Sequence, residues 1–297
     1  MKKLSFFIIY SFLLLSAHSN ELNVITTYPY IASIVENIGG DKVQVTALAS
    51  AKWDPHTILP KPSYIAQLRK ADLLIINGAQ LEIGWLPQLI RQANNPKIHF
   101  ESTGFLDLSK FVNLIDVPKN ISRASGDVHP EGNPHYYMDY MNLYQIAEAI
   151  KNKLTELNPE NQRYFTENLN KFKEKLNGKI QNWEAKIKNL YGIKVIEYHK
   201  IFDYFIKRAG LVLAGTIEPL PGIPPSSKHI EAMEKLIMME NIKFILQDVY
   251  NPDDAANYLS KKHNIKMLKL PHDVGAVDGA KDIFSLFDFI IERLNND

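Results

Sequence analysis

Two histidines in this sequence directly follow a proline that itself follows an aspartate or an asparagine. The first lies in Trp53-Asp54-Pro55-His56-Thr57, and the second begins the run Gly132-Asn133-Pro134-His135-Tyr136. Proline fixes its own φ angle and disfavours helical geometry at the residue before it, so both histidines sit on stiff backbone before anything binds. A rigidly held imidazole suits a metal ligand. We therefore predict that both imidazoles bind one ion.

Further candidates lie where α/β proteins gather their ligands. In open parallel sheets, ligands bind beyond the carboxyl ends of the strands. The candidates follow four predicted strands, two in each half of the chain, and they are His56, His135, His199 and the pair His272-Asp273. A cleft between two lobes would bring these side chains together.

Each candidate also has a purely structural interpretation. Taken singly, His56 or His135 could be a turn residue whose ring nitrogens bond nearby backbone, but the repeated X-Pro-His turn favours a metal. His199 would stand at the start of a helix, where histidine is common. Asp273 could cap the following turn, and His272 competes with it for the same role as a ligand.

Three imidazoles and one carboxylate form a closed tetrahedral set that suits Zn²⁺. We predict that the ligands are His56, His135, His199 and Asp273. Imidazole-rich sites favour the later first-row metals over Mn²⁺, which places Zn²⁺ first. Mn²⁺ and Fe²⁺ remain as the alternative ions. Four protein ligands leave no open position for an activated water, which favours metal binding over hydrolysis and predicts that the protein is not an enzyme.

Three other side chains are accessory candidates at this site. His272 is the alternative fourth ligand, and Glu218 is an alternative carboxylate. His129 is interpreted as a loop residue that could assist metal capture. The other histidines of the mature chain are interpreted as structural or surface residues, and they are His99, His229 and His263.

Composition excludes several classes of protein. The 297 residues carry a formal charge of +1, which gives no electrostatic case for nucleic-acid binding. The chain contains no cysteine, so disulfides, thiolate catalysis, zinc fingers and iron–sulfur clusters are excluded. The hydrophobic fraction of 45% is enough for a substantial core.

The first residues have the pattern of a secretory signal. Met1-Lys2-Lys3 precedes an apolar run over 4–15, and small residues follow at Ala17 and Ser19. The run is too short to span a bilayer comfortably. We predict a signal peptide over residues 1–19 and a soluble periplasmic protein. Because a lipoprotein would need a cysteine at the cleavage site, we predict that it is not a lipoprotein.

The remaining chain alternates short apolar runs with helical patterns, which is typical of parallel α/β folds. A long periodic stretch over 159–190 predicts one helix of about 45 Å, although Asn177-Gly178 could break it. We predict an N-terminal α/β lobe over 20–158, the linking helix over 159–190 and a C-terminal α/β lobe over 191–297. Each lobe would hold a four-stranded parallel sheet flanked by helices. The predicted strands are Leu22–Thr26, Val43–Ala47, Leu73–Ile76, Lys97–Glu101, Lys194–Tyr198, Leu211–Thr216, Lys243–Gln247 and Lys266–Leu270.

Five motifs in order give the chain a resemblance to a known family. They are Asp54-Pro55-His56, the N-G-x-x-x-E segment Asn77–Glu82, the G-N-P-H-Y-x-x-D segment Gly132–Asp139, Tyr198-His199-Lys200 with Tyr204-Phe205, and Glu218-Pro219 through Ser226. Over nearly its whole mature length, the chain resembles the periplasmic metal-binding components of zinc and manganese ABC transporters, of the TroA/ZnuA type.

This resemblance implies a two-lobed solute-binding protein with a rigid helix between its lobes. In such proteins the residues matching His56, His135 and His199 bind the metal, and a carboxylate near the carboxyl end completes the site. The segment Pro271–Gly275 departs from the usual motif, so either His272 or Asp273 fits the last position. The implied partners are a membrane ABC permease and its ATPase, and we expect the protein to be a monomer.

Two other classes of function remain as alternatives. A secreted metallohydrolase would use three ligands and a metal-bound water, with Asp273 or Glu218 as the base. No HExxH or similar catalytic motif supports it. An adhesin or haem-binding protein built on the same lobes has no residue-level signal.

Overall fold

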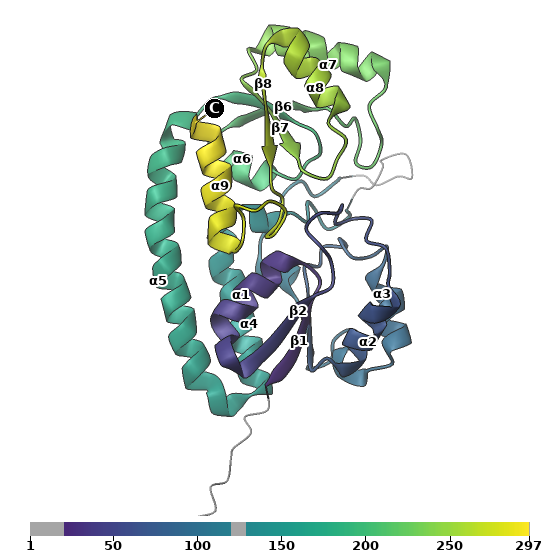
Figure 1. The fold of residues 1–297 in the computed structure, drawn as a ribbon, viewed down its shortest axis with the longest axis vertical. Coiled ribbons are helices and arrows are strands. Elements are labelled where there is room, and N and C mark those ends of the chain that lie inside the picture. The colour runs from purple at the N-terminus through teal and green to yellow at the C-terminus, as the bar shows by residue number, and fades with distance from the viewer. Residues whose placement is uncertain (1–20, 120–128, 297) are drawn as a thin grey trace, which may run out of the picture.

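The computed structural model describes residues 21–119 and 129–296. The predicted signal peptide lies outside the described residues. Within them the chain forms two α/β lobes, one above the other in Figure 1, with a long helix along one side of both. No helix of this described part is both long and apolar enough to cross a membrane.

The N-terminal lobe is built on a parallel sheet with strand order β2-β1-β3-β4. The strand β3 is buried on both faces, as its all-apolar sequence predicts. The helices begin at prolines or at polar turns and cover the sheet. The elements are β1 (Leu22–Thr26), α1 (Pro29–Gly39), β2 (Val43–Ala47), α2 (Pro62–Lys70), β3 (Leu73–Ile76), α3 (Leu86–Ala93), β4 (Phe105–Asp107) and α4 (Leu143–Leu157).

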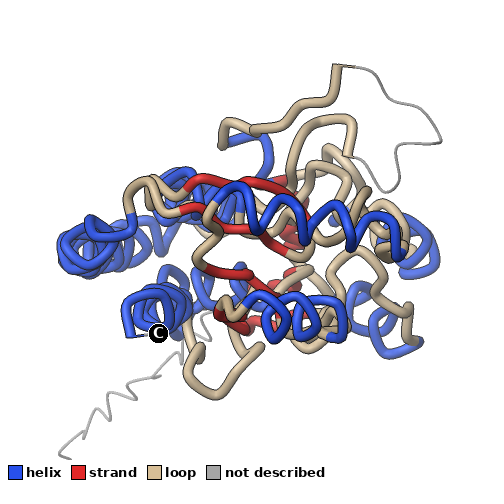
Figure 2. The backbone as a smooth tube through the Cα atoms, turned by 90° about the horizontal axis from the view of Figure 1, so that it is seen from above, coloured by secondary structure: helices blue, strands red, loops and turns tan. Residues whose placement is uncertain are grey.

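The C-terminal lobe repeats this arrangement with strand order β6-β5-β7-β8, again all parallel. Seen from above, helices lie on both sides of the strands (Figure 2). Ser226 caps the helix Ser227–Glu240, the longest helix between two strands of this lobe, by accepting a hydrogen bond from the His229 backbone N–H. The elements are β5 (Lys194–Glu197), α6 (Asp203–Arg208), β6 (Val212–Thr216), α7 (Ser227–Glu240), β7 (Phe244–Asp248), α8 (Asp254–His263), β8 (Lys266–Leu270) and α9 (Ile283–Asn296).

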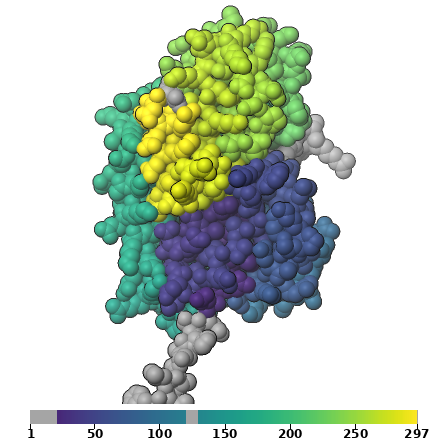
Figure 3. All heavy atoms as spheres, viewed as in Figure 1, coloured from purple at the N-terminus to yellow at the C-terminus, as the bar shows by residue number. Residues whose placement is uncertain are grey.

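The linking helix α5 runs without a break from Gln162 to Ile187. Gly178 does not interrupt it. Apolar side chains at helical spacing bury one face of α5 against α1, α4 and α9, from Phe165 to Trp183. In the space-filling view α5 forms one edge of the molecule alongside both lobes (Figure 3).

One hydrophobic core extends through both lobes. Buried residues of β1, β3, α5, β5, β7 and α9 belong to the same cluster, and a second cluster contains buried residues of β5, β7, α7 and α8. Two hydrogen bonds fix α9 against its neighbours: the Trp183 indole donates to Asp288 at 2.8 Å, and the Ile283 N–H donates to Ser33 Oγ at 3.1 Å. Separating the lobes would therefore expose shared apolar surface, which is costly.

The predicted fold class is confirmed, but one strand was predicted at the wrong place. The fourth strand is Phe105–Asp107 instead of Lys97–Glu101. Asn95 caps a tight turn that begins at Pro96, and Glu101 has a φ angle of +66°, so this segment cannot stay extended. The helix α4 begins at Leu143 and not earlier, because the Asp139 side chain accepts from the Met141 N–H and stabilises a 3₁₀ turn first.

Candidate metal centre

Three histidines from separate loops converge between the lobes. One nitrogen each of His56, His135 and His199 can be chosen so that all three atoms lie within 4.8 Å of one another. The ring centroids are 5.0 to 5.8 Å apart. They line a cavity of about 200 Å³ together with His129 and Pro221. His56 follows β2, His135 follows the segment after β4, and His199 follows β5, so each lies beyond the carboxyl end of its strand as predicted.

Asp54 fixes the orientation of His56. Its Oδ1 atom lies 2.9 Å from both the backbone nitrogen and Nδ1 of His56. Burial alone would raise the pKa of Asp54, but its hydrogen bond to His56 and the charge there hold that pKa below the usual value. With Nδ1–H donating to the carboxylate, Nε2 of His56 keeps its lone pair for a metal.

Glu218 has the same role for His199. His199 Nδ1 lies 2.5 Å from Glu218 Oε2, and Glu218 Oε1 accepts from the Gly222 N–H at 3.0 Å. Both side chains are more than nine-tenths buried. Burial lowers the pKa of His199, but the bond to Glu218 and its charge outweigh burial and raise that pKa overall. Carboxylate–histidine pairs of this kind commonly orient metal ligands.

His135 is the most deeply buried of the three, with 1% of its surface exposed. Neither of its ring nitrogens has a hydrogen-bond partner among the described residues. Burial, and after it the neighbouring imidazoles, hold the pKa of His135 well below 6.5, so the ring stays neutral. An unpartnered buried imidazole is costly unless something else satisfies it. A metal ion among the three rings would do so.

The backbone around His135 is positioned by the N-G-x-x-x-E segment. Asn77 Nδ2 donates to the Pro134 carbonyl at 3.1 Å, and the Tyr30 hydroxyl donates to Asn77 Oδ1 at 2.7 Å. The Asn77 N–H in turn donates to Glu82 Oε1 at 2.7 Å. Burial raises the pKa of Glu82 to about 7. This motif therefore positions the backbone that carries His135, and its side chains do not belong to the group of three imidazoles.

His272 and Asp273 are both buried near the centre but point differently. Asp273 accepts from the Val274 N–H at 2.6 Å, and burial raises its pKa to about 8 against the opposing backbone bonds of Val274 and Tyr30. His272 packs edge-on against Tyr250 with 4.7 Å between centroids, and its Nδ1 has no partner within the described chain. Burial lowers the pKa of His272 to about 3. Neither belongs to the group of three histidines.

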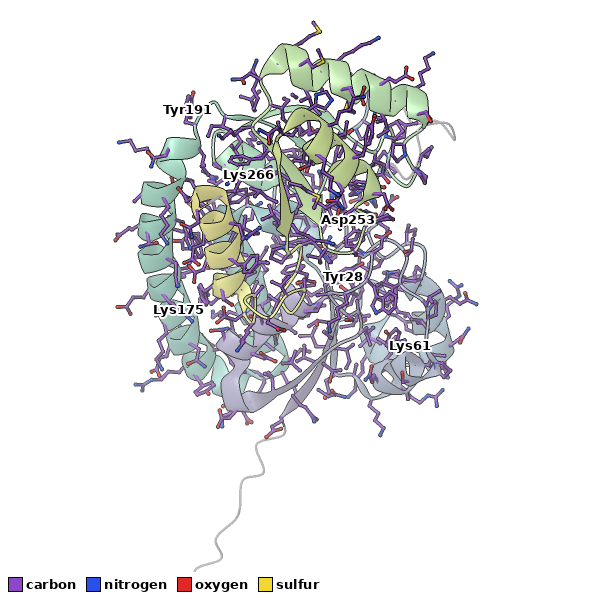
Figure 4. The ribbon with its side chains drawn as sticks, turned by 45° about the horizontal axis from the view of Figure 1, so that its top comes forward. Tyr28, Lys61, Lys175, Tyr191, Asp253 and Lys266 are labelled. Atoms are coloured by element: carbon purple, nitrogen blue, oxygen red, sulfur yellow. The ribbon has the colours of Figure 1, made fainter. Side chains whose placement is uncertain are left out.

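The remaining candidates occupy distinct places. His129 lies with its ring centroid 5.2 Å from that of His56. His229 Nε2 lies 3.0 Å from the Thr216 carbonyl oxygen, and His99 is exposed. Tyr28, which donates to the Pro55 carbonyl at 2.9 Å, lies at the junction of the lobes (Figure 4). Sequence reasoning did not assign roles to Asp54 or Asn77, although both lie in motifs that it singled out.

Comparison with known proteins then decides the family. A family model described as the periplasmic component A of a zinc-uptake complex matches residues 24–296. The chain belongs to this family. By this description the members of the family are components of an uptake complex, in agreement with the prediction that the protein is not an enzyme. The predicted resemblance to TroA/ZnuA-type binding proteins is therefore confirmed.

Individual relatives are named as substrate-binding lipoproteins of metal ABC transporters. The manganese ABC transporter substrate-binding lipoprotein PsaA of Streptococcus pneumoniae is 24% identical over 93% of this chain and 88% of its own. The metal ABC transporter substrate-binding lipoprotein ScbA of Streptococcus cristatus is 29% identical over 64% of this chain. The matched part spans 59% of the length of ScbA and 62% of that of FimA from Streptococcus parasanguinis.

Solved structures share the fold. A crystal structure of ZnuA superposes with a TM-score of 0.79 at 21% identity, covering 93% of this chain and 98% of that one. The manganese-bound periplasmic metal-binding protein of Candidatus Liberibacter asiaticus superposes with a TM-score of 0.74, at the same identity and coverage.

The comparisons correct the predicted location. The prediction of a protein that is not a lipoprotein rested on the absence of cysteine from the chain. The relatives named above are called lipoproteins, which contradicts that part of the prediction. A location on the outer side of the membrane remains consistent with their names.

Proposed function

We propose that this protein captures Zn²⁺ with high affinity outside the cytoplasmic membrane and delivers it to an ABC permease and its ATPase for import. The observation that carries the proposal is the convergence of His56, His135 and His199, whose candidate ligand atoms lie within 4.8 Å of one another. The ion is the cargo of the protein.

The donor set supports zinc over manganese. Asp54 and Glu218 each engage Nδ1 of a histidine, which presents two Nε2 atoms to the ion, while His135 contributes a neutral, buried ring. Three imidazoles favour the later first-row metals, whereas Mn²⁺ prefers carboxylate oxygens. Relatives named for manganese make Mn²⁺ the alternative cargo.

For the fourth position we propose the carboxylate of Asp273. It is buried near the centre, and its use requires the side chain to turn from the Val274 N–H toward the ion. His272 is the alternative, because its Nδ1 is buried and lacks a partner within the described chain. His129 could also serve, since it lines the cavity.

The shared core constrains how the ion leaves. Because buried residues of both lobes belong to one cluster, wide opening of the lobes would expose much apolar surface. We propose that docking on the permease moves the ligand loops locally, and that one monomer serves each docking event.

Metal analysis and competition titration test this function together. Protein purified without added metal should contain about one zinc per chain, as one site implies. Titration against a chromogenic chelator should show tighter binding of Zn²⁺ than of Mn²⁺. Co-purification of manganese with the tighter affinity for Mn²⁺ would refute the choice of zinc, and weak binding of both ions would refute metal capture.

A further inference from the structure

Asn133 joins the two loops that carry His135 and His199. We propose that Asn133 is a positioning residue that sets the separation of these two imidazoles, and through it the affinity and geometry of the metal site. The inference rests on the proposed metal-binding function and concerns a residue that does not touch the ion.

The two X-Pro-His turns are built in the same way. Asp54 Oδ1 accepts from the His56 N–H, and Asn133 Oδ1 accepts from the His135 N–H, both at 2.9 Å. Such side-chain bonds to the backbone two residues on stabilise turns. The turns differ at the ring: Asp54 also contacts His56 Nδ1, whereas both ring nitrogens of His135 lack hydrogen-bond partners in the described chain. At His135, Asn133 therefore bonds to the backbone and not to the imidazole ring.

The nitrogen of the same side-chain amide donates hydrogen bonds to residues of the C-terminal lobe. Asn133 Nδ2 donates to the Lys200 carbonyl and to Asp203 Oδ2, each at 2.9 Å. Lys200 directly follows His199 in the chain. One planar amide thus connects the backbone of one ligand with the backbone beside another. A change at this amide would alter the distance between the two imidazoles.

A third contact fixes Asn133 from the C-terminal lobe. The Tyr204 hydroxyl of α6 donates to the Asn133 carbonyl at 2.8 Å and accepts from the Ile115 N–H at 3.0 Å. Only 8% of Asn133 is exposed. Buried hydrogen bonds are costly to break without replacement, so this connection should hold in solution.

The residue type at this position matters for the same reason. An aspartate in place of Asn133 could still accept from the His135 N–H. It would lack both donors, and it would place a carboxylate against the Lys200 carbonyl and the Asp203 carboxylate. The two turns use aspartate and asparagine, and only the asparagine has partners that require an N–H donor.

The chain contains a matched control for this substitution. Asn95 also precedes a proline, and its Oδ1 accepts from the Lys97 N–H at 3.1 Å. Its Nδ2 donates to two carbonyls, those of Leu68 at 2.9 Å and Ala71 at 2.8 Å. Asn95 is 7% exposed, but all its partners belong to the N-terminal lobe and it does not line the metal cavity.

The test compares Asn133→Asp with Asn95→Asp and the wild-type chain. Zinc affinity is measured by competition with a chromogenic chelator, and the visible spectrum of bound Co²⁺ reports the coordination geometry. We expect Asn133→Asp to bind zinc about 10–100-fold more weakly, as for other residues that orient metal ligands, and to change the Co²⁺ spectrum. Asn95→Asp should lose thermal stability and keep the wild-type zinc affinity and Co²⁺ spectrum.

A second variant keeps the test decisive if Asn133→Asp does not fold. Asn133→Ala removes both Nδ2 donors and also the Oδ1 acceptor for the His135 N–H, without adding charge, and should weaken zinc binding in the same direction. Wild-type zinc affinity in a folded Asn133→Asp or Asn133→Ala protein would overturn the inference and leave the proposed function intact. A wild-type chain that binds no zinc would overturn both.

Discussion

Nδ1 of His199 lies 2.5 Å from Oε2 of Glu218, and both side chains are buried beside the metal cavity. This pair raises the pKa of His199 despite the opposing effect of burial. A metal must displace the proton from His199, so zinc affinity should fall as the pH drops below that raised pKa. Charge at Glu218 therefore controls where acid begins to weaken binding.

Replacing Glu218 with glutamine should shift this pH dependence. Glu218→Gln keeps an acceptor for Nδ1–H but removes the charge, so the pKa of His199 should fall and acid should weaken zinc binding only at a lower pH. Affinity at alkaline pH should also drop, because the imidazole becomes less basic. Competition titrations from acid to alkaline pH measure both effects. A pH profile identical to that of the wild type would contradict the role assigned to Glu218.

The buried carboxyl of Asp273 predicts a pH-dependent stability. Its pKa is raised to about 8 in the folded state, against about 3.9 in an unfolded chain. The folded state therefore holds a proton that the unfolded state has lost, and stability falls as the pH rises between these two values. Asp273→Asn keeps an acceptor for the Val274 N–H and should stabilise the metal-free protein more at pH 8 than at pH 4. Urea unfolding with a chelator present checks this, and an equal effect at both pH values would contradict it.

Zinc titration of two single variants identifies the fourth ligand. If Asp273 is the ligand, Asp273→Asn should weaken zinc binding clearly, and His272→Gln should have a smaller effect because that ring would only pack against Tyr250. The reverse order would assign the position to His272. Wild-type affinity in both variants would exclude both residues and leave His129 as the remaining candidate.

Two glycines should respond to alanine in opposite ways. Gly78 has a φ angle of +79°, and a Cβ there would overlap the Asp107 carboxylate, so Gly78→Ala should destabilise the protein by more than about 1 kcal/mol. Gly178 lies inside α5 with open space beside it, so Gly178→Ala should stabilise it by about 1 kcal/mol. Chemical denaturation measures both. A destabilised Gly178→Ala protein would contradict the description of α5 as an uninterrupted helix.

Much of the fold was predictable because its signals are local. The all-apolar Leu73–Ile76 run and the long periodic stretch of α5 each determine their own structure through burial. The fourth strand was missed because Pro96 and the positive φ angle of Glu101 create turns inside a sequence that alternates like a strand. Two contacts from outside this stretch hold the turn: Lys97 Nζ donates to Asp72 Oδ1 at 2.7 Å, and the Lys97 carbonyl accepts from the Gly104 N–H at 3.0 Å.

The candidate site was predictable to the extent that strand ends predict it. His56, His135 and His199 could be placed together because parallel strands point their carboxyl ends to one edge. The orientation of His272 and Asp273 could not be predicted, because the direction of adjacent side chains in a loop depends on tertiary partners such as Tyr250 and the start of α1. The contacts of Asn133 with Lys200 and Asp203 join distant parts of the chain, and no local pattern records them.

The zinc affinity of His135→Ala tests the central claim most directly. His135 is the buried ring whose nitrogens have no protein hydrogen-bond partner in the described chain, so a metal ion is the partner that would satisfy it. The exposed His99, replaced in the same way, serves as the control. In competition with a chromogenic chelator, His135→Ala should bind zinc far more weakly than the wild type, and His99→Ala should bind it equally well. Unchanged zinc affinity in a folded His135→Ala protein would contradict the metal centre described above.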